Sequence, residues 1–351
     1  LVLIGEGEAE FDGRRMPGGE ALTGAGIEPI KLKAKEGISL VNGTQAMLGC
    51  GGMALIDAEV LAEIADAACA LSLDALRGTP RAFDERIHQV RPHPGQLASA
   101  RLMERLLAGS EIRDSHRTCR HVQDAYSLRC APQVHGAVRD VLAETRRVFS
   151  IELNSATDNP LVFGDEILSG GNFHGQHLAL AMDSTAIALA ALAGISERRI
   201  DRLVNPMLSE GLPAFLAGHA GLESGFMMVQ VTAASLVAEL RVLASPASTG
   251  SITTSGNKED FVSMGMTSAL KLAESVKLVR LVLAIELMTA ARALEFLAPL
   301  KTSPMLETLR AAVNEVCPQS REDAVFSPRI EALSSWLRGW TDWRGANWPN
   351  M

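Results

Sequence analysis

Aromatic side chains are scarce in this sequence of 351 residues. They make up 4% of the chain, and tyrosine occurs once, at Tyr126. The hydrophobic share of 47% is therefore mostly Ala, Leu, Val, Ile and Met. Such a composition is typical of long, closely packed helices with a large buried core, because Ala, Leu and Met lose little side-chain freedom in a helix. Length alone leaves open one large domain or two or three small ones.

The sequence also lacks a basic block, a cysteine framework and a metal motif. Its net charge of −8 is spread along the chain, which gives no indication of binding to nucleic acid or to an anionic membrane. The five cysteines are widely separated and include no CxxC pair, so neither a disulfide framework nor a zinc site is predicted. The close histidine pair His174 and His177 has no further ligand that we can place. We therefore expect a cytoplasmic protein without a metal.

No clean apolar run reaches the twenty or so residues that a membrane span needs. The longest uncharged stretch, 37–56, contains five glycines and several polar residues. The apolar run after Val276 is interrupted by four charged side chains. The sequence therefore predicts no membrane span.

From Thr44 onward, apolar periodicity predicts helices. We expect long helices over about 44–77, 95–109, 133–150, 173–205, 221–245, 258–298, 304–317 and 328–340. The segment 173–205 is apolar nearly all round, which indicates burial inside a bundle or between subunits. Strands are expected only in the first thirty residues, where Asp12-Gly13 is a hairpin signal. We predict a mainly α fold with one helical domain over 1–351, composed of a turn- and hairpin-rich segment (1–30) and a helical bundle (31–351).

The segment around the lone tyrosine contains residue types that suit an amino-acid site. Gln123, Tyr126 and Arg129 follow one another at steps of three, so they lie within a turn or two if the segment is helical. Pro132 disfavours helical backbone at Ala131, which predicts a break that leaves Arg129 near a helix end. An arginine fork suits a carboxylate, a phenol can move protons, and an amide can orient a neighbour. The alternative is a helix end whose Tyr and Arg are half-buried anchors.

Three further segments carry polar side chains that a core would not choose. Residues 42–45 (Asn-Gly-Thr-Gln) precede an apolar helix, and 169–176 are glycine-rich, so that backbone could approach a ligand closely. The loop 246–260 ends with Asn257 and Asp260 at the spacing of a capping box, which leaves Glu259 able to bind a cationic or imidazole group. Each segment also has a structural interpretation as a turn or helix cap. The capping residues would then be Thr44, Asn172 and Asn257.

Together these segments resemble the aromatic amino-acid ammonia-lyase family, and among its members most closely those that act on histidine. The matching segments run in family order at 3–9, 35–45, 122–130, 158–161, 171–175, 195–199 and 259–264. The resemblance implies a homotetramer of long helices in which three subunits build each active site around a small amino-acid substrate. It also implies an electrophilic 4-methylidene-imidazol-5-one group, formed from an internal Ala-Ser-Gly. That group lets ammonia leave from Cα as a proton leaves Cβ.

The resemblance assigns catalytic roles to three residues of this chain. Asn42 matches the asparagine beside the prosthetic group and the substrate carboxylate. Tyr126 and Gln123 match the tyrosine and the glutamine that line the prosthetic group.

Three residues match substrate-binding positions of the family. Arg129 matches the arginine that binds the carboxylate, and Phe173 matches the aromatic wall of the pocket. Glu259 matches a position that is glutamate in histidine-specific members and tends to be glutamine in phenylalanine-specific ones. A carboxylate can pair with an imidazole N–H, whereas a phenyl ring would leave it unpaired. We therefore expect elimination of ammonia from L-histidine to give trans-urocanate.

The sequence departs from the family pattern at two places. Ala-Ser-Gly occurs nowhere in it; in the family this tripeptide, like the loop with the tyrosine base, lies upstream of the segment that begins here at Leu1. We expect the C-terminal two-thirds of such an enzyme, as a fragment, a processed product or a split chain. Phe261 stands where histidine-specific members usually carry histidine, and 175–177 are closer to tyrosine- or phenylalanine-using relatives. A tyrosine or phenylalanine ammonia-lyase, a 2,3-aminomutase and a non-catalytic chain of a split or truncated lyase stay open as alternatives.

Overall fold

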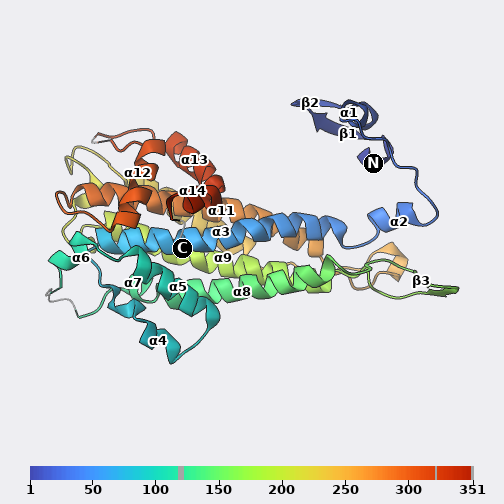
Figure 1. The fold of residues 1–351 in the computed structure, drawn as a ribbon, viewed down its shortest axis with the longest axis horizontal. Helices are drawn as coiled ribbons and strands as arrows, with labels where there is room; N and C mark the ends of the chain where they lie inside the picture. Colours follow the sequence, from blue (N-terminus) through green and yellow to red (C-terminus); the bar gives the residue numbers. More distant parts are fainter. Residues whose placement is uncertain (118–121, 321, 349–351) are drawn as a thin grey trace. The chain divides into compact units, whose positions relative to one another are not determined.

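The computed structural model describes residues 1–117, 122–320 and 322–348. Its contacts form two compact units, and Figure 1 gives the element labels used for both. The small unit comprises Leu1–Ala46 and Ser155–His174, and the large unit comprises Met47–Asn154 and Gly175–Met351. The expectation of one domain is not tested by this grouping and stays a prediction.

The small unit contains the predicted N-terminal hairpin. Strands β1 (Glu8–Phe11) and β2 (Arg14–Pro17) pair antiparallel across a two-residue turn. Asp12 and Gly13 in that turn have φ values of 51° and 69°. Positive φ at both central residues is the turn that matches the twist of two paired strands, so the hairpin signal is confirmed. The remaining elements of this segment are the 3₁₀ turn η1 (Val2–Ile4) and the helices α1 (Gly18–Gly24) and α2 (Glu36–Val41).

A second hairpin in the small unit contradicts the expectation that strands occur only in the first thirty residues. Strands β3 (Leu161–Phe163) and β4 (Glu166–Leu168) pair antiparallel. Each strand has three residues, and most of their side chains are exposed. A hairpin this short buries no face, so it leaves no alternating apolar pattern by which sequence could reveal it.

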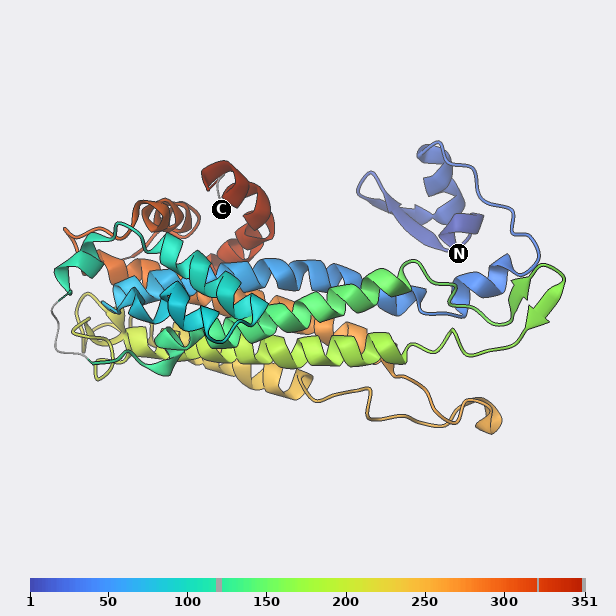
Figure 2. The same cartoon turned by 60° about the horizontal axis from the view of Figure 1, so that its bottom comes forward.

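The large unit is a bundle of long helices, and all eight predicted helices are present. Figures 1 and 2 show the longest of them running side by side. The eight are α3 (Gln45–Ala75), α5 (Pro94–Leu106), α8 (Ala131–Glu152), α9 (Gln176–Val204), α10 (Met227–Leu243), α11 (Gly265–Glu295), α12 (Pro304–Val316) and α13 (Ser327–Trp336). Shorter elements lie between and after them: η2 (Pro80–Phe83), α4 (Glu85–Gln89), α6 (Glu111–Ser115), α7 (Tyr126–Arg129), η3 (Ala214–Leu216), η4 (Ser255–Asn257), η5 (Leu337–Gly339) and α14 (Trp340–Asn347).

Helix α9 lies in the core of the bundle, as its sequence predicted. It packs against α8, α10 and α11, and Leu178, Met182 and Leu189 are fully buried. An 18-residue window of this 29-residue helix has a mean hydropathy of 1.8, which also meets the composition of a membrane span, but 56% of that window is buried inside the protein. Contacts with neighbouring helices therefore account for more than half of this apolar window.

Two of the capping interpretations are wrong. Helix α11 begins at Gly265 rather than near 258, and Asn257, with φ of 69°, caps no long helix. The loop instead closes on itself, because the Thr254 N–H donates to the Glu259 carbonyl at 2.9 Å. Asn172 does not cap α9, whose N-cap is Gly175; its side chain donates to the Ala156 carbonyl at 3.3 Å.

Candidate active site

The tyrosine segment forms the short helix α7, and Arg129 is its last residue. The chain leaves helical geometry at Cys130 (φ −98°, ψ 11°), and Ala131 already begins α8. Pro132 lies in the first turn of α8, where its missing N–H would be unpaired in any case. The predicted helix end near Arg129 is therefore confirmed, but the expectation of non-helical backbone at Ala131 is wrong, because the break lies at Cys130.

Arg129 and Tyr126 form one structural element on α7. The guanidinium carbon of Arg129 lies 4.7 Å from the centroid of the Tyr126 ring, a cation–π distance. Tyr126 is 71% exposed, so it is no half-buried anchor; Leu128, which is 2% exposed, anchors α7 in the core. The Arg129 Nε is buried, and among the described residues it has no hydrogen-bond partner. A buried, unpaired guanidinium N–H is a donor available to a ligand carboxylate.

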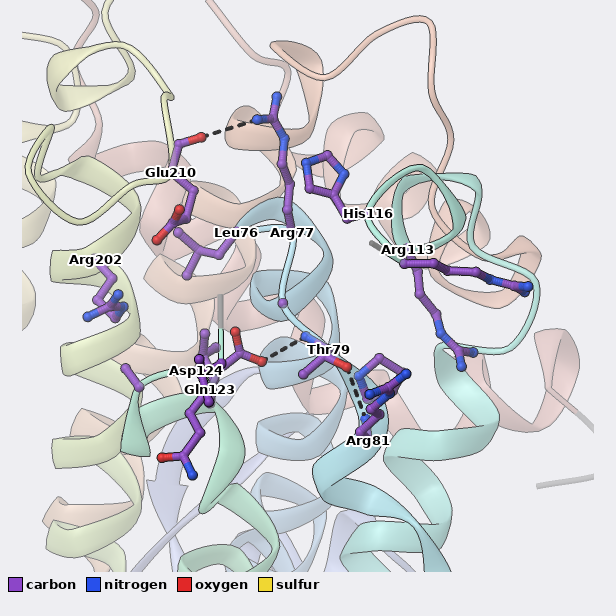
Figure 3. A pocket seen from close by; sticks show the side chains of 16 residues that line it. Leu76, Arg77, Thr79, Arg81, Arg113, His116, Gln123, Asp124, Arg202 and Glu210 are labelled. Carbon is purple, nitrogen blue, oxygen red and sulfur yellow. Dashed lines mark hydrogen bonds between the residues drawn. The ribbon is translucent and has the colours of Figure 1, made fainter. Parts of the chain in front are cut away.

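The start of the tyrosine segment is tied to the end of helix α3. The Asp124 carboxylate accepts a hydrogen bond of 2.7 Å from the backbone N–H of Thr79 (Figure 3). Arg77, two residues earlier, donates to the carbonyl of Glu210 at 3.3 Å. These contacts fix the backbone on both sides of a polar cavity.

The cavity beside the tyrosine segment has a volume of about 700 Å³. Gln123 lines it, but Tyr126 and Arg129 do not. The lining includes two acids, Asp124 and Glu210, and a larger number of cationic side chains (Figure 3). The arginines are Arg77, Arg81, Arg113, Arg117 and Arg202. An excess of fixed positive charge in a concave site raises the local concentration of anions.

Glu259 lies in the loop 246–264 that precedes α11. Its carboxylate accepts a hydrogen bond of 2.6 Å from the Thr254 hydroxyl. Hydrogen bonds from the Thr254 and Ser255 hydroxyls lower the pKa of Glu259, so it is a carboxylate at neutral pH. The neighbouring Phe261 is 60% exposed.

Within one chain, Glu259 and the Tyr126–Arg129 element lie at opposite ends of the bundle. Met47, at the start of α3, packs against Gly265, the first residue of α11 after the loop that contains Glu259. A Cβ atom added to Gly265 would lie 2.5 Å from the Met47 Sδ. The other end of α3 leads into Thr79, which bonds Asp124. The rise of 1.5 Å per helical residue separates these ends by roughly 40 Å. Figure 1 shows α7 at one end, and Figure 2 shows the loop before α11 (gold to orange) extending from one end of the bundle.

Asn42 and Phe173 belong to the small unit. Asn42 ends α2, and its N–H donates to the Ile38 carbonyl at 2.8 Å. The Asp158 carboxylate accepts from the Ser39 hydroxyl at 2.8 Å and from the Lys35 ammonium, which joins α2 to the segment 155–174. Phe173 lies half-buried in that segment. The six predicted residues are thus distributed over both units.

Sequence reasoning gave no role to Asp158 or Asp124, although both are structural ties beside predicted site residues. Asp158 belongs to the Asp-Asn-Pro match noted above, and its position before an X-Pro bond was the available signal. Asp124 lies between Gln123 and Tyr126 and had no distinguishing spacing.

The described residues contain no group of three or more His, Cys, Asp or Glu side chains that could hold a metal. Four cysteines in the described part of the chain are free thiols: Cys50, Cys69, Cys130 and Cys317. Cys119 lies outside the described residues.

The chain is similar in sequence and structure to known aromatic amino acid lyases. A family model described as "Aromatic amino acid lyase" matches residues 1–315. The chain is 61% identical to histidine ammonia-lyase from Koribacter versatilis over 96% of this chain and 68% of that protein. The crystal structure of histidine ammonia-lyase from Trypanosoma cruzi superposes with a TM-score of 0.88 at 44% identity, over 98% of this chain and 66% of that one. Tyrosine aminomutase from Streptomyces globisporus gives a TM-score of 0.92 at 39% identity, over 98% and 70%. The chain thus spans about two thirds of the length of these relatives.

Proposed function

This chain belongs to the aromatic amino acid lyase family, and from that premise we propose that it contributes to elimination of ammonia from L-histidine, with trans-urocanate as product. It has the helical fold of its structural neighbours. The observation that carries the proposal of histidine as substrate is the identity of 61% to a histidine ammonia-lyase over nearly all of this chain.

The free side chains of the site fit the uncharged prosthetic group of the family. Within the described residues, no hydrogen bond is found for the side chains of Asn42, Gln123 and Tyr126, so their amide and phenol groups are available as donors. These three residues would hold a 4-methylidene-imidazol-5-one; its parent tripeptide Ala-Ser-Gly does not occur among the 351 residues. When present, that group supplies an electrophilic methylene that withdraws electron density from the substrate. No metal enters the proposal.

The chain's own residues bind and orient the substrate. Arg129 holds the carboxylate through its unpaired guanidinium N–H, and Asn42 donates to the same carboxylate. Glu259 accepts a hydrogen bond from the imidazole N–H of histidine, and its lowered pKa keeps it ionised for that task. Phe173 packs against the ring. Fixing the amino acid at both ends holds the Cα and Cβ hydrogens in one orientation for elimination.

We further propose a homotetramer with shared sites, and the positions of these residues support sharing between protomers. Arg129 and Glu259 lie at opposite ends of the bundle, so one substrate reaches both only when different protomers contribute them. Exposed apolar side chains on four long helices support burial between subunits, because soluble monomers rarely expose large apolar surfaces. These side chains are Met53, Ile56, Leu180, Ile187, Met228, Val231, Met266 and Leu270. The assembly is cytoplasmic and involves neither nucleic acid nor membrane.

A tyrosine 2,3-aminomutase is the second candidate. The TM-score of 0.92 to tyrosine aminomutase and the exposed Phe261 beside Glu259 favour it. An aminomutase returns the amino group to Cβ and so releases a β-amino acid. Chromatography of the products separates the two candidates.

The test uses the full-length protein that contains this chain. Incubation with L-histidine should raise absorbance in the urocanate band, whereas L-tyrosine and L-phenylalanine should give little product. Arg129→Ala measured in parallel shows whether the activity belongs to this protein. Preference for tyrosine or phenylalanine, or a β-amino acid product, would overturn the proposal.

A further inference from the structure

The two arginines of the Ile195–Arg199 segment have opposite surroundings. Arg198 is 59% exposed at its side chain and pairs with Glu197 beside it. The Arg199 side chain is completely buried in the middle of the bundle. A buried guanidinium is costly unless all its donors are paired, so the contacts of Arg199 indicate what it does.

Arg199 makes a two-pronged ion pair with Glu286 of α11. Its Nε and Nη2 donate to the two carboxylate oxygens at 2.5 and 2.8 Å. Ser72 of α3 and Ser196 of α9 also donate to this carboxylate, at 2.8 and 2.5 Å. Glu286 is therefore fully hydrogen-bonded, and it fixes the plane of the guanidinium.

The remaining arm of Arg199 reaches α7. Its Nη1 donates to the Ser127 carbonyl at 3.2 Å. Ser127 lies between Tyr126 and Arg129, and a four-residue helix cannot pair its own last carbonyls. The same Nη1 lies 3.4 Å from Nε2 of His135. The Nδ1 of His135 bonds the Asp66 carboxylate at 2.7 Å, and burial lowers the pKa of His135, so the neutral ring accepts at Nε2.

We infer that Arg199 is a positioning residue for the Tyr126–Arg129 element. The Glu286 carboxylate is held by side chains of α3 and α9, and it orients the Arg199 guanidinium. The guanidinium in turn holds the Ser127 carbonyl. Within the described structure, this is the only backbone carbonyl of α7 that accepts a hydrogen bond from a side chain. Leu128 holds α7 by apolar burial, which permits sliding and rotation, whereas the Arg199 bond is directional. The orientation of the carboxylate-binding Arg129 thus depends on a residue that touches no substrate. The inference rests on the proposed function.

The test is R199K in the full-length protein, measured as kcat and KM for L-histidine. Lysine keeps the charge but lacks the fork, so it cannot hold Glu286 and the Ser127 carbonyl at once. We expect KM to rise about tenfold, in keeping with loss of one buried hydrogen bond at the binding helix. R139K is the matched control, because Arg139 pairs with buried Asp66 of the same network at 2.6 Å, and its hydrogen bonds within the described structure go to Asp66 and Ala62 rather than to α7. It should lower thermal stability without changing KM.

A double-mutant cycle separates positioning from general destabilisation. If Arg199 acts through Arg129, R199K should change KM much less in an R129K background than alone. Should R199K not fold, E286Q serves instead, because it weakens the ion pair that orients Arg199. An unchanged KM in the folded variant, or additive effects in the cycle, would overturn the inference. An inactive wild-type protein would instead refute the proposed function.

Discussion

The guanidinium of Arg129 lies over the ring of Tyr126, at 4.7 Å from its centroid, while its Nε points to no partner among the described residues. One residue pair therefore combines a guanidinium with the only phenol of the chain. The contact favours one orientation of the guanidinium. Preorganisation of this kind lowers the entropy cost of binding.

Arg129→Ala should weaken substrate binding more than it slows turnover. The substitution removes a charge-assisted hydrogen bond worth roughly 1.5–3 kcal/mol, so KM should rise by about ten- to a hundredfold.

Tyr126→Phe keeps the ring beneath the guanidinium but removes the hydroxyl, and it should lower kcat with a smaller change in KM. Steady-state kinetics of both variants gives kcat and KM. If kcat and KM change equally in both variants, these roles are contradicted.

Glu259→Gln should reduce activity on histidine and improve relative activity on phenylalanine. A neutral amide forms a weaker bond to the imidazole and costs less to bury against a phenyl ring. The ratio of kcat/KM for the two substrates measures the change. Asp260→Asn is the neighbouring control and should leave the ratio near the wild-type value.

Mixed assemblies test whether sites are shared. Arg129→Ala and Glu259→Ala chains, denatured and refolded together, should recover part of the activity that each homogeneous sample lacks. The gain arises because some sites receive intact residues from both kinds of protomer. No recovery, although native mass spectrometry detects mixed tetramers, would show that one protomer supplies both residues.

Stability should depend on pH through Asp74, which is buried and has one carboxylate oxygen without a partner among the described residues. Burial raises its pKa from 3.8 to about 6, although the Thr302 and Ser110 hydroxyls and Arg113 oppose the shift. The folded state therefore binds the proton more tightly, and stability falls as pH rises from about 4 to 6. A shift of two units corresponds to roughly 3 kcal/mol.

Asp74→Asn should remove this loss. The unfolding free energy of the variant, measured by denaturant titration, should rise relative to that of the wild type between pH 4 and 6. The difference should persist at pH 7. Asp84→Asn is the opposite control, because the Arg86 side chain lowers the pKa of half-buried Asp84 to about 2. Parallel curves for Asp74→Asn and wild type would contradict the assignment.

The thiols should react in order of burial. Burial raises the pKa of Cys69 to about 12, so it should resist iodoacetamide in the native state, whereas half-buried Cys50 and Cys130 should be alkylated first. Peptide mass spectrometry at increasing reaction times gives the order. Early alkylation of Cys69 in folded protein would contradict the burial of this part of α3.

Sequence predicted those parts of the fold in which one segment determines its own structure. Apolar periodicity located all eight long helices, and Asp12-Gly13 located the first hairpin, because both signals are local. The start of α11 was misplaced by seven residues because the pairing of Thr254 with Glu259 outweighs an apparent capping box. The hairpin of β3 and β4 was missed because it has no buried face.

The candidate site shows the same division between local and long-range information. Pro132 predicted a helix end near Arg129, although the break falls at Cys130 and the residue before the proline, Ala131, is helical. The tie between Asp124 and Thr79 joins residues 45 positions apart, and the bond from Arg199 to Ser127 joins residues 72 apart. Neither contact produces a pattern among residues that are adjacent in the sequence. The roles of all six candidate residues stay predictions until tested by substitution: Asn42, Gln123, Tyr126, Arg129, Phe173 and Glu259.

The chain order of the bundle has a consequence for its synthesis. Helix α9 leaves the ribosome after α3 and α8 but before α10 and α11, which cover its remaining apolar face. For the time needed to translate about a hundred further codons, that face is open to water, to chaperones and to other nascent chains. A message truncated between α9 and α11 should therefore yield an insoluble product, even though its first helices are intact.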